Sequence, residues 1–372
     1  MAEAGIPPSQ TDHQAEGSSS PNDKSAPVTQ SIFKNGQYIN PWDTWEDNTL
    51  KKFLKWVLFD KSKINLPSAS ELDTTLPVKE VNYEELKRPP PPGSIRVVWI
   101  GHASTLVQFD GITFLTDPIF SQTCGPKGII GKKRYRPCPV TVEELPEINA
   151  VFTSHNHFDH LDEHTVRALN ERFGESLRWF APLGLKQWFR DTGCENVVEM
   201  DWWQESCLES HPEILIAFTP TQHWTRRSAR DYCKTLWGSW VIKGPSASFY
   251  FAGDTGYCKG FKEIGNRYGP FSLAAIPIGA YEPLWFKKAF HISPEEAAKV
   301  HIDVKAQKSL GIHWGTFRLG SEFYLDPPKK AIEAMENLGQ NPDDFFTLHH
   351  VLARPSLLVS DVQECGIIFQ DW

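Results

Sequence analysis

The stretch TSHNHFDHLD, residues 153–162, decides the fold, and it follows directly on the apolar segment AVF at 150–152. Its candidate ligands are His155, His157, Asp159 and His160, all within six residues. A strand that ends in a tight loop can turn several such side chains toward one point, and imidazole with carboxylate is a ligand set for Zn²⁺ or a similar divalent ion. A lone histidine would more often be an ordinary buried or surface residue, but four ligand types packed this closely predict a metal site.

Further ligand types follow other apolar segments downstream. His223 comes after EILIAFTP (213–220), Asp254 after SFYFAG (248–253) and His313 after KSLGI (308–312). Each is ambiguous alone, but their recurrence just beyond runs that should be buried is hard to explain by core packing. One six-residue loop cannot saturate two ions, so these residues are the candidates to complete a two-metal site.

Short apolar segments alternate with helical ones beyond Ser94. Strands are predicted for IRVVWIG, STLVQFDG, ITFLTDP, AVFTSHNH, EILIAFTP, SWVIKG and SFYFAGD. Helices are predicted over 162–172, 183–191, 294–301 and 329–337. The alternation predicts a layered α/β fold in which strand ends supply polar residues to one rim.

The N-terminal part divides into two segments. Residues 1–37 are predicted to be a disordered tail, since up to about residue 30 they are rich in Ser, Pro and Gln and nearly devoid of aromatic residues. Residues 38–93 form an amphipathic segment and the Pro-rich spacer RPPPPG, and 94–372 form the catalytic domain. Apolar residues at helical spacing, capped by Asn48, predict an aromatic-rich basic helix from Leu50 to Leu58, which either lies in a membrane interface or packs on the main domain.

Composition excludes several classes of protein. The formal net charge is -8, which gives nucleic-acid binding no global electrostatic support. The seven cysteines are scattered without a C-x-x-C pair, so reduced thiols and an intracellular location are expected. The sequence begins MAEAGIPPSQ, without the pattern of a secretory signal, and contains no apolar run long enough to span a membrane.

The motif H-x-H-x-D-H resembles the metallo-β-lactamase superfamily, which implies a four-layer αβ/βα sandwich with a binuclear site at one edge. The segments WIGHAST, LTDPIF, DWWQE, LWGSW, FAGDTGYC, LAAIPIGAYEP and IHWGTF are similar, more narrowly, to the N-acylphosphatidylethanolamine-hydrolysing phospholipase D family. The similarity extends from about residue 38 to residue 346.

This resemblance implies a ligand assignment for two zinc ions per chain. One ion would be held by His155, His157 and His223, the other by Asp159, His160 and His313, with Asp254 bridging them. It also implies zinc-dependent hydrolysis of N-acylphosphatidylethanolamine to an N-acylethanolamine and phosphatidic acid through a metal-activated bridging hydroxide. The implied setting is peripheral, on membrane surfaces that face the cytosol, as a homodimer that acts on a membrane phospholipid.

Other residues are given roles as hypotheses. Asp159 would also orient the attacking hydroxide or accept its proton, and His291 would contact the phosphate or protonate the leaving alkoxide. Arg227 would bind the anionic substrate, and His102 is interpreted as a buried structural histidine or a partner of the ligands. We expect anionic headgroups to be attracted by a basic run of Lys127, Lys132, Lys133, Arg134 and Arg136. The Trp-rich stretch 179–189 was expected to contact the membrane or acyl chains.

The sequence departs from the family at Leu284, where arginine is expected, in the loop 121–131, and from residue 351 onward. Other interpretations remain open: a soluble lactonase or phosphoesterase, a nuclease, which the acidic balance disfavours, and a membrane-surface scaffold that uses metal only for stability.

Overall fold

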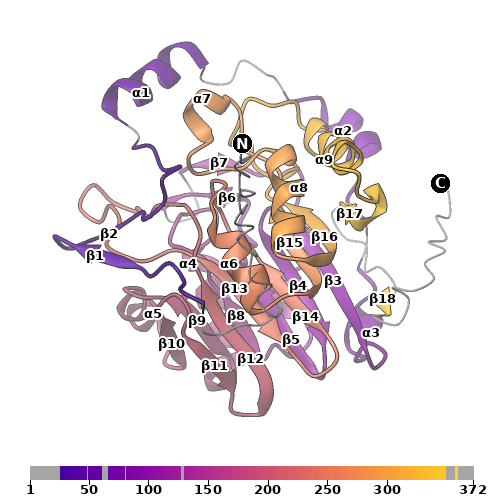
Figure 1. Ribbon diagram of the computed structural model, residues 1–372. Helices are drawn as coiled ribbons and strands as arrows, with labels where there is room; N and C mark the ends of the chain where they lie inside the picture. Colours follow the sequence, from indigo (N-terminus) through magenta and orange to yellow (C-terminus); the bar gives the residue numbers. More distant parts are fainter. Residues whose placement is uncertain are drawn as a thin grey trace, which may run out of the picture.

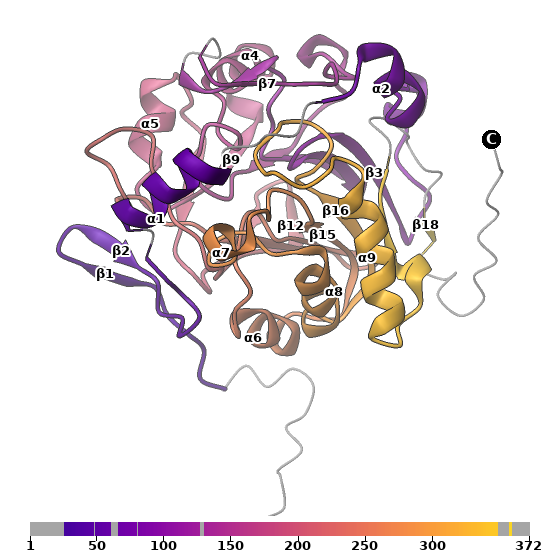
Figure 2. The ribbon, with the colours of Figure 1, turned by 90° about the horizontal axis from the view of Figure 1, so that it is seen from above.

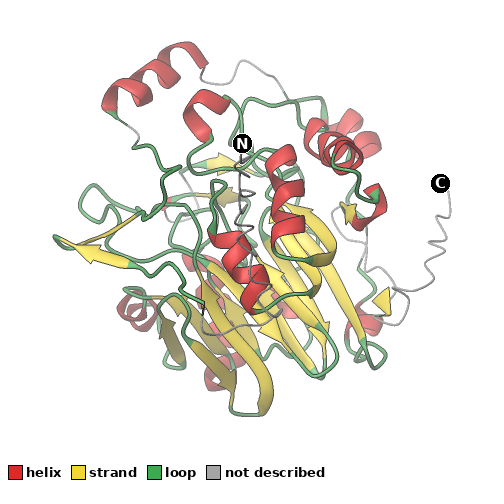
Figure 3. Cartoon of the chain, viewed as in Figure 1, coloured by secondary structure: helices red, strands yellow, loops and turns green. Residues whose placement is uncertain are grey.

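Two seven-stranded β-sheets form the centre of the molecule, and helices lie on the outer faces (Figures 1 and 3). The computed structural model describes residues 26–47, 49–60, 66–79, 81–126, 130–348 and 357–358. The first sheet runs, in spatial order, β10 (Val197–Met200), β9 (Arg178–Pro182), β8 (Ala150–Phe152), β5 (Ile112–Thr116), β4 (Ser104–Phe109), β3 (Ser94–Gly101) and β18 (Leu357–Leu358). The second runs β11 (Glu205–Leu208), β12 (His211–Thr219), β13 (Ser239–Lys243), β14 (Ser248–Phe251), β15 (Phe271–Pro277), β16 (Ala306–Ile312) and β17 (Phe345–Phe346).

Each sheet has an antiparallel part and a parallel part. In the first sheet β3, β4 and β5 pair antiparallel, whereas β5, β8, β9 and β10 pair parallel. In the second sheet β11 to β14 are antiparallel and β14 to β17 are parallel. Strands β3, β5 and β8 therefore end at one edge of the first sheet, and β12, β14 and β16 end together at one edge of the second.

The helices complete four layers. Helices α4 (Glu163–Phe173) and α5 (Lys186–Asp191) lie on one side, and α6 (Gly260–Arg267), α8 (Pro294–Asp303) and α9 (Asp326–Asn337) on the other (Figure 2). One buried cluster joins Leu106 and Val151 of the first sheet to Val166 of α4. A larger cluster lies between the sheets, where the rings of Phe114 and Phe249 are 5.6 Å apart, and continues to α8 and α9. The αβ/βα sandwich is thus confirmed.

The predicted tail boundary at residue 37 is too late. The structure describes the chain from residue 26, and Ile32–Lys34 (β1) and Gln37–Ile39 (β2) form an antiparallel hairpin. The hairpin contains Ile32, Phe33, Tyr38 and Ile39, which are apolar or aromatic, and the Tyr38 backbone N–H donates to the Cys233 carbonyl at 2.7 Å. The composition that favours disorder therefore ends near residue 30. Residues 1–25 lie outside the described residues.

The amphipathic segment is helical but shorter than predicted. Helix α1 (Leu50–Lys55) continues into one π-helical turn, Trp56–Asp60, and has no buried residue. Its cap is Thr49, whose side chain accepts the Lys52 N–H, whereas the predicted cap Asn48 is outside the described residues. Trp56 stacks on Phe286 of α7 (Leu284–Lys287) with ring centroids 5.2 Å apart. Figures 1 and 2 show α1 beside α7. The short helices α2 (Ala69–Thr75) and α3 (Tyr83–Leu86) follow.

Trp179, Phe180 and Phe189 of the Trp-rich stretch 179–189 are core residues and cannot contact a membrane, whereas Leu183 and Trp188 are half-buried. Trp179 is 1% exposed and Phe189 fully buried. Strand β9 pairs parallel with neighbours on both sides and is covered on both faces. A strand buried in this way is a continuous apolar run without alternation, which explains the wrong prediction. No helix among the described residues is both long and apolar enough to cross a membrane.

Candidate metal centre

The loop after β8 gathers the first group of ligand-type side chains. The His155 Nε2 lies 2.8 Å from the His157 Nδ1, and the His157 carbonyl accepts the backbone N–H groups of His160 and Leu161. This turn folds the loop back, so residues close in sequence point to one place. The Ser154 hydroxyl lies 2.9 Å from the His155 Nδ1 and orients the ring.

His223 joins this group from the other sheet, just beyond β12. Its Nδ1–H donates to the Phe290 carbonyl at 2.9 Å, which leaves the Nε2 free to face the centre. That Nε2 lies 3.2 Å from the His157 Nδ1. His155, His157 and His223 each offer one ligand atom within 4.8 Å of the others.

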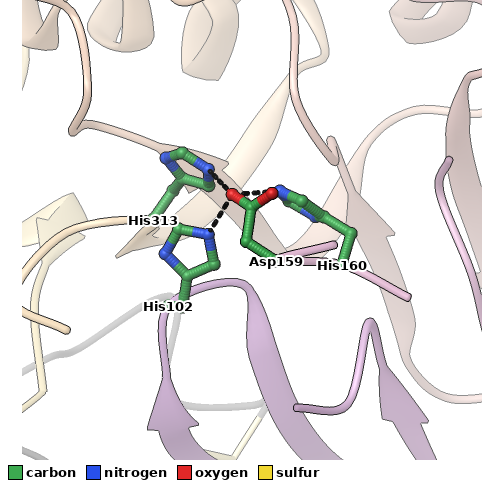
Figure 4. Close-up of side chains that lie close together, drawn as sticks. All are labelled: His102, Asp159, His160 and His313. Atoms are coloured by element: carbon green, nitrogen blue, oxygen red, sulfur yellow. Dashed lines mark hydrogen bonds and ion pairs between the residues drawn. The ribbon is translucent and has the colours of Figure 1, made fainter. Parts of the chain in front are cut away.

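A second group surrounds Asp159 (Figure 4). Its Oδ2 lies 3.5 Å from the His160 Nε2, 3.7 Å from the His313 Nε2 and 2.9 Å from the His102 Nε2. His313 follows β16 with a positive φ of 62°, and its backbone N–H donates to the His102 carbonyl at 2.9 Å. His102, which follows β3, is therefore part of the centre by position, with its ring centroid 4.0 Å from that of His313.

Asp254 lies between the two groups. Its Oδ2 is 3.2 Å from the His160 Nε2 and 3.8 Å from the His223 Nε2, and its Oδ1 is 3.0 Å from the His313 Nε2. The preceding Gly253 has a φ of +60°, and a Cβ there would lie 2.6 Å from the Ser154 Cβ. Glycine thus allows the loop after β14 to approach the loop after β8 closely. All seven residues that the sequence singled out as candidate ligands meet at one point.

Asp117, which we did not predict from the sequence, orients His160 by a hydrogen bond on the side of the ring that faces away from the centre. It follows β5, and its Oδ2 accepts from the His160 Nδ1 at 2.6 Å, while its Oδ1 accepts the Ser154 N–H at 2.7 Å. The other ring nitrogen of His160 is thereby directed toward Asp254. The signal was present in ITFLTDP, because Asp117 also stands just beyond a buried strand, as the candidate ligands do.

The electrostatics of the centre favour bound cations. Burial lowers the pKa of His157 to about 4 and that of His223 to about 3, so both rings are neutral and can offer lone pairs. Burial alone would raise the pKa of Asp254, but His160 and His313 beside it hold that pKa well below its usual range. Burial likewise opposes protonation of His313, yet Asp254 and Asp159 raise its pKa to about 9. The buried Asp254 and the half-buried Asp159 therefore demand positive charge here.

Unpartnered atoms point to the same conclusion. The His157 Nε2, the His160 Nε2, the His313 Nε2 and the Asp254 Oδ1 are buried without a hydrogen-bond partner in the described part of the chain. Buried polar atoms are normally satisfied, because an unsatisfied one costs about 1–3 kcal/mol. Imidazole nitrogens with carboxylate oxygens are the donor set of zinc sites, so these residues fit such a metal.

The remaining predicted residues lie around this centre in different roles. The His291 Nδ1 is 3.7 Å from the Asp254 Oδ2 and has no hydrogen-bond partner, so His291 lies at the centre as expected. Arg227 differs from the prediction: its Nη1 donates to the carbonyls of Asn156 and Leu161, at 2.9 and 2.7 Å. These contacts stabilise the loop after β8 that carries His155 to His160. The neighbouring Arg226 lines the cavity.

Two members of the predicted basic run are also structural. Arg134 is 5% exposed and donates to the Ile119 carbonyl at 2.5 Å, and Arg136 is 7% exposed and pairs with Asp73 at 2.8 Å. Neither is free to attract headgroups. Lys132 and Lys133 in β7 (Lys132–Lys133), which pairs with β6 (Thr123–Cys124), are exposed, and Lys127 lies outside the described residues.

The centre opens into a cavity of about 1060 Å³. Asp159, Asp254 and His291 line its floor, and its walls are mostly apolar or aromatic. The apolar part of the wall comes from α1, α7 and nearby loops: Trp45, Leu50, Phe53, Trp56, Ile130, Trp224, Phe286, Phe290 and Leu319. Exposed apolar side chains lie on α1, on the turn after it, on α7 and at Ile130, and these segments also contribute to the cavity wall. We call these side chains the apolar rim: Leu50, Phe53, Leu54, Leu58, Phe59, Ile130, Leu284 and Trp285.

Known proteins share both the sequence and the fold. A model of the beta-lactamase superfamily domain matches residues 113–314, which is more than half of the chain. The chain is 40% identical over 314 residues to N-acyl-phosphatidylethanolamine-hydrolyzing phospholipase D 1 of Caenorhabditis elegans, with 82% of this chain and 86% of that protein covered. It is 38% identical to the mitochondrial N-acyl-phosphatidylethanolamine-hydrolyzing phospholipase D of Saccharomyces cerevisiae, with 62% of this chain and 50% of that protein covered.

Among solved structures, Igni18, a metallo hydrolase from Ignicoccus hospitalis, has a similar fold. The TM-score is 0.52 at 18% identity, with 71% of this chain and 97% of that chain covered. The fold thus agrees with the superfamily match, and the sequence similarity confirms the narrower resemblance. The chain belongs to the N-acyl-phosphatidylethanolamine-hydrolysing phospholipase D family of the beta-lactamase superfamily.

Proposed function

We propose that this protein is a zinc-dependent phospholipase D that hydrolyses N-acylphosphatidylethanolamine to an N-acylethanolamine and phosphatidic acid. The observation that carries the proposal is a buried centre of histidines and aspartates at the floor of a large cavity with apolar walls. Such a cavity suits a substrate with a charged phosphodiester and long acyl chains. The names of the C. elegans and yeast relatives support the same substrate.

The proposed ligands for two zinc ions divide as the resemblance implies. His155, His157 and His223 would hold one ion, and Asp159, His160 and His313 the other, with Asp254 between them. The central position of Asp254 supports this division, since a bridging carboxylate partly neutralises both cations. Bound zinc supplies Lewis acidity toward the phosphoryl group and lowers the pKa of coordinated water to about 7.

The side chains around the phosphate have proposed roles of their own. Asp159 borders the cavity and would orient the attacking water or accept its proton. His291, with an unpartnered Nδ1 at the centre, would donate a hydrogen bond to the phosphate or to the leaving oxygen. Arg226, which lines the cavity, would contact the substrate in place of Arg227.

Geometry also makes His102 and His291 possible ligands, so the seven-ligand assignment needs its own test. Each lies within 4.8 Å of other ligand atoms of the centre. Zinc content per chain, measured by plasma mass spectrometry, should stay near two in His102→Ala and His291→Ala. It should fall in His223→Ala and His313→Ala, and loss of zinc from His291→Ala would make His291 a ligand.

We also propose peripheral association with membranes that face the cytosol; the apolar rim supports the membrane part of this proposal. Leu58 is 72% exposed and Leu50 73%, and Leu50 also lines the cavity that a lipid would enter. Solvent-exposed apolar side chains gathered around a cavity mouth favour a lipid surface as the partner. The soluble lactonase alternative gives no reason for such a rim. The homodimer is supported by the family resemblance, and light scattering of the purified protein would test it.

The deciding experiment is turnover of N-acylphosphatidylethanolamine by purified protein in detergent, in ¹⁸O-labelled water, with and without a chelator. We expect N-acylethanolamine and phosphatidic acid, with the label in phosphatidic acid because water attacks phosphorus. Chelation should abolish turnover and added zinc restore it. Release of diacylglycerol or of free fatty acid, or turnover that survives complete removal of metal, would overturn the proposal.

A further inference from the structure

One buried cation on the cavity wall has no role in the centre described above. Lys287 of α7 is 8% exposed and lines the same cavity as Asp159 and Asp254. Its Nζ donates to the Leu319 carbonyl at 3.2 Å and lies 5.6 Å from the centroid of the Phe290 ring. No carboxylate of the described residues forms an ion pair with this ammonium group.

An ammonium group buried in this way is costly, because a carbonyl and aromatic faces replace its hydration only in part. Burial lowers the pKa of Lys287, which reflects the same cost. An anion that enters the cavity would repay it. The site therefore favours a ligand that brings negative charge.

The backbone directs Lys287 toward the metal centre. The His291 N–H donates to the Lys287 carbonyl at 2.9 Å, so the two residues are one helical turn apart and project from the same face. His291 reaches the centre, since its Nδ1 is 3.7 Å from the Asp254 Oδ2. Lys287 thus lies about 6 Å further along this face, near enough for one phosphate group to contact both.

A second cation lines the cavity beside it. Arg318 precedes Leu319, whose carbonyl accepts from Lys287, and both Arg318 and Lys287 line the cavity. The Arg318 Nη2 is buried without a hydrogen-bond partner. Lys287 and Arg318, which come from separate segments, therefore both have hydrogen-bond donors available at the cavity wall.

We propose that Lys287 and Arg318 form an anion subsite that binds the phosphate oxygens of the substrate beside the metal centre and positions the phosphorus for attack. This inference rests on the proposed function, because it assumes a phosphoester substrate. Lysine supplies a compact charge and arginine a planar fork that matches two oxygens. Both are positioning residues: they act by holding the phosphate rather than by moving a proton.

The test uses the zinc-loaded full chain and inorganic phosphate as the probe, with affinity measured by titration calorimetry. Lys287→Met keeps the length of the side chain and removes its charge, and should weaken phosphate binding at least about tenfold, the effect of losing a charge-assisted hydrogen bond. Lys287→Arg should restore the affinity to within about threefold. Lys288→Met is the matched control, because the adjacent lysine is exposed and should leave the affinity unchanged.

Arg318→Gln provides an independent arm and should also weaken phosphate binding. Circular dichroism identifies the variants that fold, and zinc content identifies those that are loaded with metal. Phosphate affinity equal to that of the unmodified protein in folded Lys287→Met overturns the proposal. If that variant does not fold, unchanged affinity in Arg318→Gln overturns it instead.

Turnover separates this inference from the proposed function. On lipid vesicles, Lys287→Met should lower kcat/KM mainly through a higher KM, without loss of zinc. If the unmodified protein does not cleave N-acylphosphatidylethanolamine but phosphate binding still depends on Lys287, the subsite stands and the lipid assignment falls.

Discussion

The metal centre and the apolar rim lie at the same end of the molecule, but different forces hold them. His155, His160 and His313 are at most 2% exposed and stand on loops between buried strands. Leu54 and Leu58 of the rim are 49% and 72% exposed, and α1 has no buried residue. The centre is fixed from behind by hydrogen bonds such as that of Asp117 to His160, whereas contacts of Trp56 and Lys55 with α7 hold α1.

This difference separates chemistry from delivery of the substrate. Residues that must hold a metal need positions fixed to a fraction of an ångström, which a packed sheet edge provides. Residues that meet a lipid surface need only to be apolar and accessible, so weak packing there costs little function. Changes in the centre should therefore abolish catalysis, and changes in the rim should alter access.

The largest effect is expected for Asp254→Ala. Loss of the carboxylate between the two groups should lower zinc content and reduce turnover by about 10³-fold or more, since metal ions contribute several kcal/mol to charge stabilisation. Asp110→Asn is the control, because Asp110 accepts the backbone N–H groups of Ser246 and Ala247 beyond the far end of β4. Two zinc ions and normal turnover in Asp254→Ala would contradict the central role of this residue.

Substitutions in the apolar rim should lower membrane binding and leave turnover of a dispersed substrate nearly unchanged. In Leu54→Asp/Leu58→Asp, flotation with liposomes should fall by about 10²-fold, because each leucine buried in lipid contributes about 1.5–3 kcal/mol. Turnover of a detergent-dispersed substrate should stay within about twofold, since neither side chain lines the cavity. Ile332→Asp on α9, 44% exposed and distant from α1 in Figures 1 and 2, should leave flotation unchanged. If the double variant floats with liposomes as the unmodified protein does, the apolar rim has no role in membrane binding.

Asp117→Asn tests the support behind the centre. It should weaken zinc affinity by about 10–100-fold, the usual cost of losing a hydrogen-bond partner of a metal ligand, while the fold persists. Competition with a chelator of known affinity measures this change. An affinity equal to that of the unmodified protein would mean that the buried Ser154 and His160 keep their positions without Asp117.

The sequence predicted which side chains converge at the centre because these residues obey a local rule. Each candidate ligand stands at or just beyond the end of a buried strand, and strand ends at one edge converge. The same rule would have found Asp117 and placed His102 at the centre. What it could not tell was which of two adjacent arginines faces the cavity, since Arg226 and Arg227 differ only in how the chain turns after His223.

The rim was predicted less well, because exposure depends on what packs around a residue. The segments 50–58 and 179–189 both contain several aromatic and aliphatic residues, yet Leu50, Leu54 and Leu58 are exposed whereas Trp179, Phe180 and Phe189 are buried. Trp179 and Phe180 are buried because β9 pairs with a strand on each side. This pairing depends on distant segments, so residues 179–189 alone could not predict it.

The smallest effect is expected for Trp56→Ala, and it tests whether the two regions are independent. Trp56 stacks on Phe286 with an interplanar angle of 10°, and such aromatic pairs contribute about 0.5–1.5 kcal/mol. Hydrogen exchange over residues 50–60 should therefore accelerate about two- to tenfold, because α1 leaves α7 more often. Phe33→Ala removes a comparable pair, that of Phe33 with Tyr38 at 4.8 Å, and should not change exchange over 50–60. Zinc content and exchange in β8 should stay unchanged in both variants, because the aromatic and cation–π contacts that hold α1 and its π-helical turn are made with α7. Faster exchange in β8 of Trp56→Ala would mean that the rim and the centre open together, and the division between chemistry and delivery would then fail.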